Sequence, residues 1–154
     1  LVTPKTPKVH YQKKATGLKS SHFDMIKSLE LSKEDHIHLK NFCKKKSIDF
    51  ISTPYDIESA IFLNKLGCNI FKTSSADIVD LELHACLAKT KKTVIISTGM
   101  STIEEIKKCI EIYKKHSNKN YILLHLVQLN HFDYHFFEIL KSIYSFVNDR
   151  NEKP

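Results

Sequence analysis

Apolar and polar positions follow two different patterns along this chain. Short runs of apolar, often β-branched residues predict strands, and longer segments with an apolar side chain every three to four residues predict helices. From position 48 onward the two alternate, with expected strands at 48–52, 70–73, 93–97 and 121–127 and expected helices at 56–66, 80–89, from 102 onward and at 133–147. This alternation predicts a parallel sheet with helical crossovers.

The first 47 residues do not share this alternation. Residues 1–19 are rich in lysine and contain two prolines, which disfavour a helix, so we expect a loop or lid there. Two helices should follow without a strand between them, one capped by Ser21 and one that starts after Ser32. We interpret the chain as one domain with a loop at 1–19, a helical excursion at 20–47, βα units at 48–147 and a tail at 148–154.

Composition narrows the class of protein. A chain of 154 residues with 42% hydrophobic and 27% charged residues is typical of one globular domain. The net charge of +7 comes from lysines scattered over the expected helices, without a basic stripe interleaved with aromatics, so we do not expect nucleic-acid binding. No apolar run approaches the roughly 18 residues that span a membrane. Four widely spaced cysteines without a CxxC pair indicate reduced thiols and a cytoplasmic protein.

Polar side chains recur where the expected strands end. These strand ends read Ser52-Thr53-Pro54, Lys72-Thr73-Ser74-Ser75, Ser97-Thr98-Gly99 and His125-Leu126-Val127-Gln128. These groups are suited to binding an oxyanion: the hydroxyls and the lysine are donors, and the glycine permits close approach of a ligand to the backbone. The carboxyl ends of parallel strands face the ligand both in a TIM barrel and at the switch point of an open sheet, and periodicity does not separate these folds. Hydroxyls that only cap the following helices are the alternative.

These segments resemble, in order and spacing, the sialic acid synthase family. The resemblance covers about residues 3–127 and rests on four linked motifs: Phe50-Ile51-Ser52-Thr53-Pro54-Tyr55-Asp56, Phe71-Lys72-Thr73-Ser74-Ser75-Ala76-Asp77, Ile96-Ser97-Thr98-Gly99-Met100-Ser101-Thr102 and Leu123-Leu124-His125. It implies a TIM barrel that condenses phosphoenolpyruvate with an N-acetylmannosamine-type sugar. The products would be phosphate and a nine-carbon 2-keto acid.

The resemblance also implies roles for individual residues. Lys72 would contact the anionic groups of phosphoenolpyruvate, and Lys72 and Asp77 would be the catalytic residues. Asp77 matches the position of an acidic residue near the acceptor sugar and the intermediate. The substrate-binding set would be Thr53, Tyr55, Lys72, Ser75, Ser97 and Gln128, in which Tyr55 is an aromatic beside the pocket and Gln128 a polar ligand contact.

The family uses a divalent metal, manganese or magnesium, to polarise the sugar aldehyde. The two metal-binding histidines of the family belong to segments outside this chain, so we expect the metal ligands to be absent here. His131 and His135 have a spacing compatible with metal binding in a helix, but no carboxylate completes the set. The implied partners are therefore small molecules, phosphoenolpyruvate and an N-acetylated hexosamine.

Four strands are half of a TIM barrel, which typically needs about 250 residues. The expected fold class is thus α/β, a partial TIM (β/α)8 barrel of about four consecutive βα units. Two functions remain open: a synthase of which this chain is a portion, or a truncated, catalytically inactive remnant or interaction protein without the metal site. The unpaired sheet edges of such a half barrel are compatible with a homo-oligomer.

Overall fold

The computed structural model describes residues 5, 7 and 21–126. Their contacts divide the chain into two compact units, one that ends at Phe50 and one that begins at Ile51. The first unit contains helices α2 (His22–Lys27) and α3 (Lys33–Lys45). Our prediction of a loop or lid at 1–19 falls outside the described residues, apart from positions 5 and 7.

Side-chain caps start both helices of the first unit, as the sequence predicts. The Asp24 backbone N–H donates to the Ser21 hydroxyl over 3.0 Å at the start of α2. At the start of α3, Ser32 and Asp35 form a reciprocal capping box with two bonds of 3.0 Å. Each cap satisfies N–H groups that the first helical turn leaves without a partner.

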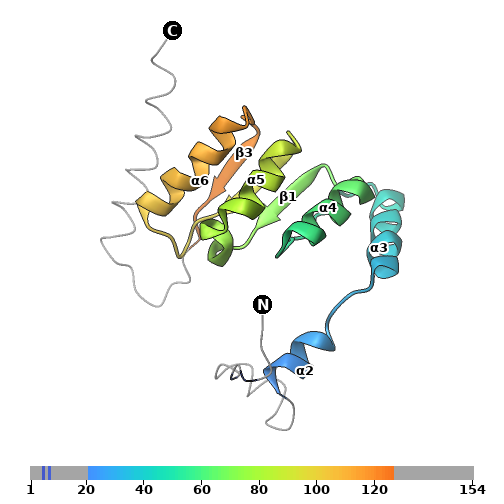
Figure 1. The fold of residues 1–154 in the computed structure, drawn as a ribbon. Coiled ribbons are helices and arrows are strands. Elements are labelled where there is room, and N and C mark those ends of the chain that lie inside the picture. Colours follow the sequence, from blue (N-terminus) through green and yellow to red (C-terminus); the bar gives the residue numbers. More distant parts are fainter. Residues whose placement is uncertain (1–4, 6, 8–20, 127–154) are drawn as a thin grey trace. The chain divides into compact units, whose positions relative to one another are not determined.

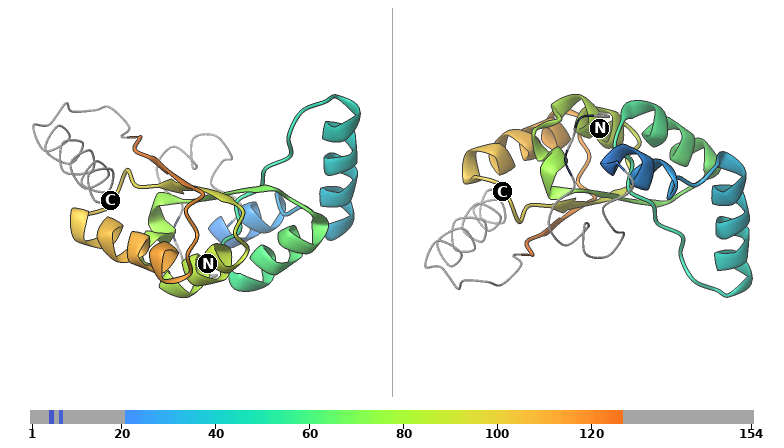
Figure 2. Two further views of the ribbon diagram at one scale, coloured as in Figure 1. Left: turned by 90° about the horizontal axis from the view of Figure 1, so that it is seen from above. Right: turned by 90° about the horizontal axis from the view of Figure 1, so that it is seen from below.

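The second unit is a three-stranded parallel sheet with helices on one face. Strands β1 (Ile70–Thr73), β2 (Thr93–Ser97) and β3 (Tyr121–Leu124) are neighbours in that order. Helices α4 (Ile57–Leu66), α5 (Leu81–Lys89) and α6 (Ile103–Lys115) alternate with them along the chain (Figure 1). Seen along the sheet, all three helices lie on the same side of it (Figure 2). The predicted α/β class with a parallel sheet is therefore confirmed.

One predicted strand is wrong, and one element was not predicted. Residues 48–54 adopt no regular secondary structure, although 48–52 has a strand-like apolar pattern. A strand needs a hydrogen-bonded neighbour, and within residues 21–126 β1 pairs only with β2, so its other edge has no strand beside it. The short 3₁₀ helix η1 (Ser75–Val79) directly follows β1. The expected helix at 133–147 lies outside the described residues.

The core of the second unit lies between the sheet and its helices. Phe71 and Thr73 on β1 are fully buried and lie opposite Val94 and Ile96 on β2 in the strand register. These four side chains share the face that the helices cover, since alternate residues of a strand point to opposite faces. Lys72 and Ser97 belong to the other face. The sequence alternation thus separates the face that packs against the helices from the face that carries Lys72 and Ser97.

Candidate functional site

A cavity of about 230 Å³ lies at the carboxyl end of the sheet. It is lined by the ends of β1, β2 and β3, the turn after β1 and the segment before α4, through Thr53, Tyr55, Lys72, Ser74, Ser75, Ser97, Gly99, Leu124 and Leu126. Parallel strands bring their carboxyl ends to one edge of the sheet, which is why residues up to 73 positions apart meet here. Five of the seven predicted catalytic and substrate-binding residues line this one cavity: Thr53, Tyr55, Lys72, Ser75 and Ser97.

Lys72 supplies the positive charge of the cavity. Its side chain is half-buried, and its ammonium group donates a long hydrogen bond of 3.5 Å to the Thr73 carbonyl oxygen. Among residues 21–126 the single ion pair joins Lys114 and Glu111 on α6, far along the chain from this site. No described carboxylate therefore neutralises Lys72, and its charge is available to an anion in the cavity.

Hydroxyl groups surround this charge. Ser74 caps η1, because its hydroxyl accepts a hydrogen bond of 3.3 Å from the Ala76 backbone N–H. The hydroxyls of Ser75, Ser97 and Thr53 make no hydrogen bond to another described residue. A hydroxyl can donate to an oxyanion while it accepts a bond from elsewhere. The capping alternative thus holds for Ser74, and the other three hydroxyls remain available to a ligand.

The structure explains the glycine at position 99 differently from the sequence analysis. A methyl group at this position would overlap the carbonyl oxygen of Leu126. The sequence interpretation attributed the glycine to close approach by a ligand, whereas the group that approaches it here is the neighbouring backbone. Only glycine allows the chain segments after β2 and β3 to come so close at the cavity wall.

Among the predicted site residues that the structure describes, Asp77 is the one that does not line the cavity. Asp77 lies in η1, half-buried, with its Oδ2 atom buried and without a hydrogen-bond partner among the described residues. Burial raises the pKa of this carboxyl, the negative charge of Asp80 adds to the rise, and a hydrogen bond from the Ser74 backbone opposes it. Gln128 lies outside the described residues, as do His131 and His135.

Sequence reasoning missed the apolar wall of the cavity, which Leu124 and Leu126 form. His125 Nδ1 lies 2.9 Å from the Thr98 hydroxyl oxygen, a contact between two strand ends. Alternate residues at the ends of two neighbouring strands line the cavity, Ser97 and Gly99 at the end of β2 and Leu124 and Leu126 at the end of β3. This alternation is the sequence signal that could have identified Leu124 and Leu126 as lining residues.

The donors of the cavity suit an anion rather than a metal ion. A divalent cation binds carboxylate, imidazole or thiolate groups, and the lining instead contains a lysine and hydroxyls. Within residues 21–126, no three His, Cys, Asp or Glu side chains lie close enough together to hold a metal ion. In the same part of the chain, no helix is both long and apolar enough to cross a membrane.

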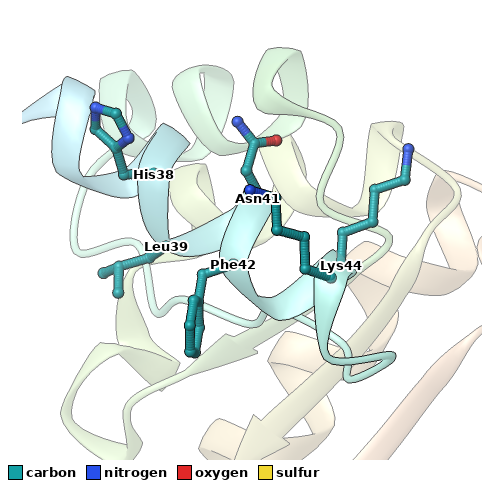
Figure 3. A pocket seen from close by; sticks show the side chains of 6 residues that line it. His38, Leu39, Asn41, Phe42 and Lys44 are labelled. Atoms are coloured by element: carbon teal, nitrogen blue, oxygen red, sulfur yellow. The ribbon is translucent and has the colours of Figure 1, made fainter.

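A second and larger hollow, in the first unit, does not form a comparable site. The six described residues that line it all belong to α3, including His38, Phe42 and Lys44 (Figure 3). Their side chains fan out from the helix instead of pointing toward a common centre. A ligand site needs polar groups that converge, usually from several elements. We therefore place the candidate site at the end of the sheet.

Parallel βα units with the site at the carboxyl ends of the strands define an α/β protein, either a TIM barrel or an open parallel sheet. A crystal structure of N-acetylneuraminic acid (sialic acid) synthetase from Leptospira borgpetersenii in complex with citrate matches this chain with a TM-score of 0.71 and 29% identity. The match covers 86% of this chain and 48% of that one. The fold is therefore part of a TIM barrel, as the sequence predicts.

Residues 1–130 match the NeuB family, and the chain belongs to that family. It is 39% identical over 126 residues to N,N'-diacetyllegionaminic acid synthase of Campylobacter jejuni, which covers 80% of this chain and 38% of that protein. The enzyme of the same name from Legionella pneumophila is 35% identical and is covered to 36% of its length. The chain thus spans less than half the length of these relatives, and the predicted family resemblance is confirmed.

Proposed function

We propose that this chain forms the phosphoenolpyruvate-binding part of a sialic acid synthase. The enzyme would condense phosphoenolpyruvate with an N-acetylmannosamine-type sugar, forming a nine-carbon 2-keto acid and releasing phosphate. The observation that carries this proposal is the cavity in which Lys72 and the hydroxyls of Thr53, Ser75 and Ser97 meet. The names of the similar enzymes, synthases of sialic and legionaminic acids, support the choice of reaction.

The chemistry of the cavity fits the charge of phosphoenolpyruvate. Its phosphate and carboxylate are acceptors, and the Lys72 ammonium group and each of the three hydroxyls can donate a hydrogen bond to them. Hydrogen bonds from a charged donor to an oxyanion are roughly twice as strong as neutral ones. The volume of about 230 Å³ lies below the range of about 300–1,000 Å³ for sites of drug-sized ligands, as a small anion requires.

In the proposed reaction, C3 of phosphoenolpyruvate forms a bond to the aldehyde carbon of the sugar. Water then adds at C2, and the C2–phosphate oxygen link is lost as phosphate leaves. Lys72 and the hydroxyls would hold the phosphoenolpyruvate charge in place during these steps. Tyr55, which is 61% exposed, would flank the sugar at the cavity rim, and Asp77 would act next to the acceptor.

A divalent metal ion, manganese or magnesium, would polarise the sugar aldehyde when bound. The described residues do not fit such an ion, so this chain's own part in the proposal is limited to anion binding and positioning. The predicted contact of Gln128 with substrate stays a prediction.

Calorimetric titration of the chain with phosphoenolpyruvate tests the proposal. Loss of a charge-assisted bond should weaken binding at least tenfold in Lys72→Ala, because such bonds contribute about 1.5–3 kcal/mol. Lys107→Ala removes an equal charge from the exposed surface of α6 and should leave the affinity unchanged. Equal affinity of Lys72→Ala and the wild type would contradict the proposal. Phosphate release with N-acetylmannosamine as acceptor then separates a synthase from an inactive remnant that retains binding alone.

A further inference from the structure

Thr98 and His125 form a hydrogen-bonded pair directly after β2 and β3. The Thr98 side chain is fully buried, and its hydroxyl oxygen lies 2.9 Å from His125 Nδ1. A second, longer contact of 3.5 Å joins the same hydroxyl to the Leu124 carbonyl oxygen. Neither side chain lines the cavity.

The neighbours of this pair in sequence do line the cavity. Ser97 and Gly99 flank Thr98, and Leu124 and Leu126 flank His125. Side chains of an extended segment alternate between its two faces, so the pair lies on the opposite face from the cavity lining. The Thr98–His125 hydrogen bond therefore joins the two segments that form one wall of the cavity, on the face away from the cavity.

The regular ladder between these segments ends at the pair. Strand pairing runs to Ser97 and Leu124, and residues 125 and 126 belong to no strand. Beyond that point the segments are joined by the Thr98 backbone N–H, which donates to the Leu124 carbonyl oxygen over 2.9 Å, and by the side-chain pair. The close approach of Gly99 to the Leu126 carbonyl requires both segments to stay together.

We propose that Thr98 and His125 are positioning residues of the anion site. Their hydrogen bond extends the pairing of β2 and β3 past the end of the ladder, and it thereby fixes the hydroxyl of Ser97 and the backbone of Gly99 toward the bound anion. Donors that are fixed before binding bind more tightly, because less conformational freedom is lost. This role rests on the proposed binding of phosphoenolpyruvate, but the geometry of the strand ends can be measured without any ligand.

Thr98→Val tests the pair because it keeps the shape of the side chain and removes the hydroxyl, whereas Thr98→Ser retains the hydroxyl. Thr90→Val is the matched control. Its hydroxyl also makes two local bonds, one of 2.7 Å to the Leu87 carbonyl and one of 3.2 Å from the Lys92 backbone N–H, at the far end of α5 from the cavity. His125→Asn retains a nitrogen or oxygen near the Nδ1 position, and His125→Leu does not.

The first measurement is amide hydrogen exchange at position 98, read by NMR on the 154-residue chain without ligand. We expect exchange about three- to tenfold faster in Thr98→Val and His125→Leu, the effect of one lost hydrogen bond, and near-wild-type rates in Thr98→Ser, His125→Asn and Thr90→Val. The Nδ1 resonance of His125 should shift in Thr98→Val and return in Thr98→Ser. Unchanged exchange in Thr98→Val would overturn the proposal.

The second measurement is the affinity of the same variants for phosphoenolpyruvate. The affinity should fall in Thr98→Val by about the same factor as that by which amide exchange rises. It should recover in Thr98→Ser and stay unchanged in Thr90→Val. Wild-type affinity in Thr98→Val, or an equal loss in Thr90→Val, would overturn the positioning role. If the wild-type chain does not bind phosphoenolpyruvate but exchange responds as expected, the proposed function fails, and the tie between the strand ends stands.

Discussion

His84 on α5 and Tyr113 on α6 form a buried hydrogen-bonded pair, with 3.0 Å between Nδ1 and the phenol oxygen. Both side chains are fully buried, and their rings meet edge to face with centroids 5.7 Å apart. Burial raises the pKa of the Tyr113 hydroxyl, so this group keeps its proton and can donate to the imidazole. The pair joins two of the helices that cover one face of the sheet.

The pair predicts an acid-sensitive fold. Burial lowers the pKa of His84 to about 4, against the weaker opposing effect of the Asp80 charge, from 6.5 in the unfolded chain. Between these values the unfolded state binds the proton and the folded state does not, so stability falls as pH falls from 6.5 toward 4. The expected loss from this residue is about 3 kcal/mol, measured by urea unfolding at pH 7 and pH 4.

His84→Gln is the variant for comparison, because it retains a polar side chain and does not titrate. Its unfolding free energy should be lower than that of the wild type at pH 7, since the shape and the bond to Tyr113 are altered. The difference between variant and wild type should shrink at pH 4. An equal difference at both pH values would show that His84 is not responsible for the acid sensitivity.

Gly99→Ala should damage both stability and anion binding. The added methyl group would overlap the Leu126 carbonyl, so two backbone segments must move apart, at a cost of about 1–3 kcal/mol. Gly67→Ala is the control, because Gly67 ends α4 with φ of 84°, a conformation that alanine adopts only with strain. Both variants should unfold at lower urea concentration. Only Gly99→Ala should lose affinity for phosphoenolpyruvate.

Local sequence signals predicted much of this fold. The helix expected at 56–66 is α4, which Asp56 caps and Gly67 ends, and the helix expected from 102 onward is α6, which begins at a capping box of Thr102 with Glu105. The convergence of the strand ends followed from the parallel order of the sheet. These features depend on backbone chemistry within one element or on the topology of the repeat.

What the sequence did not predict depends on residues far apart in the chain. The apolar run at 48–52 has strand propensity, but no described neighbour pairs with it. His84 and Tyr113 are 29 positions apart, and Thr98 and His125 are 27 apart. Their spacing carries no periodic signal, because the contacts arise only after the helices and strands have packed.

Asn118 provides a test of such a distant contact. The NH2 group of its buried side chain donates hydrogen bonds of 3.1 and 3.3 Å to the carbonyl oxygens of Ala88 and Lys92. Its Oδ1 atom accepts a hydrogen bond of 2.9 Å from the Asn120 backbone N–H. Asn118→Leu leaves these groups without their partner, which should lower the unfolding free energy by about 2–4 kcal/mol. Urea unfolding measures the loss. Asn120→Ala, which removes one exposed bond to Lys91, should cost less than 1 kcal/mol.

Asp77→Asn should stabilise the fold while it impairs the reaction. The pKa of Asp77 is raised above 3.8 in the folded chain, so the folded state favours the protonated carboxyl and loses stability as pH rises through the folded pKa. Asparagine has the same shape, carries no charge and can still accept the bond from the Ser74 backbone. The variant should therefore have a higher melting temperature than the wild type at pH 7, and the difference should vanish at pH values well below 3.8.

The effect of Asp77→Asn on function separates the two halves of the proposed reaction. Because Asp77 does not line the cavity, affinity for phosphoenolpyruvate should stay within about twofold of the wild type. Phosphate release with the sugar acceptor should fall at least tenfold, since its proposed role lies beside the acceptor. Loss of phosphoenolpyruvate affinity instead would place this carboxyl in the anion site, and unchanged phosphate release would remove it from the catalytic residues.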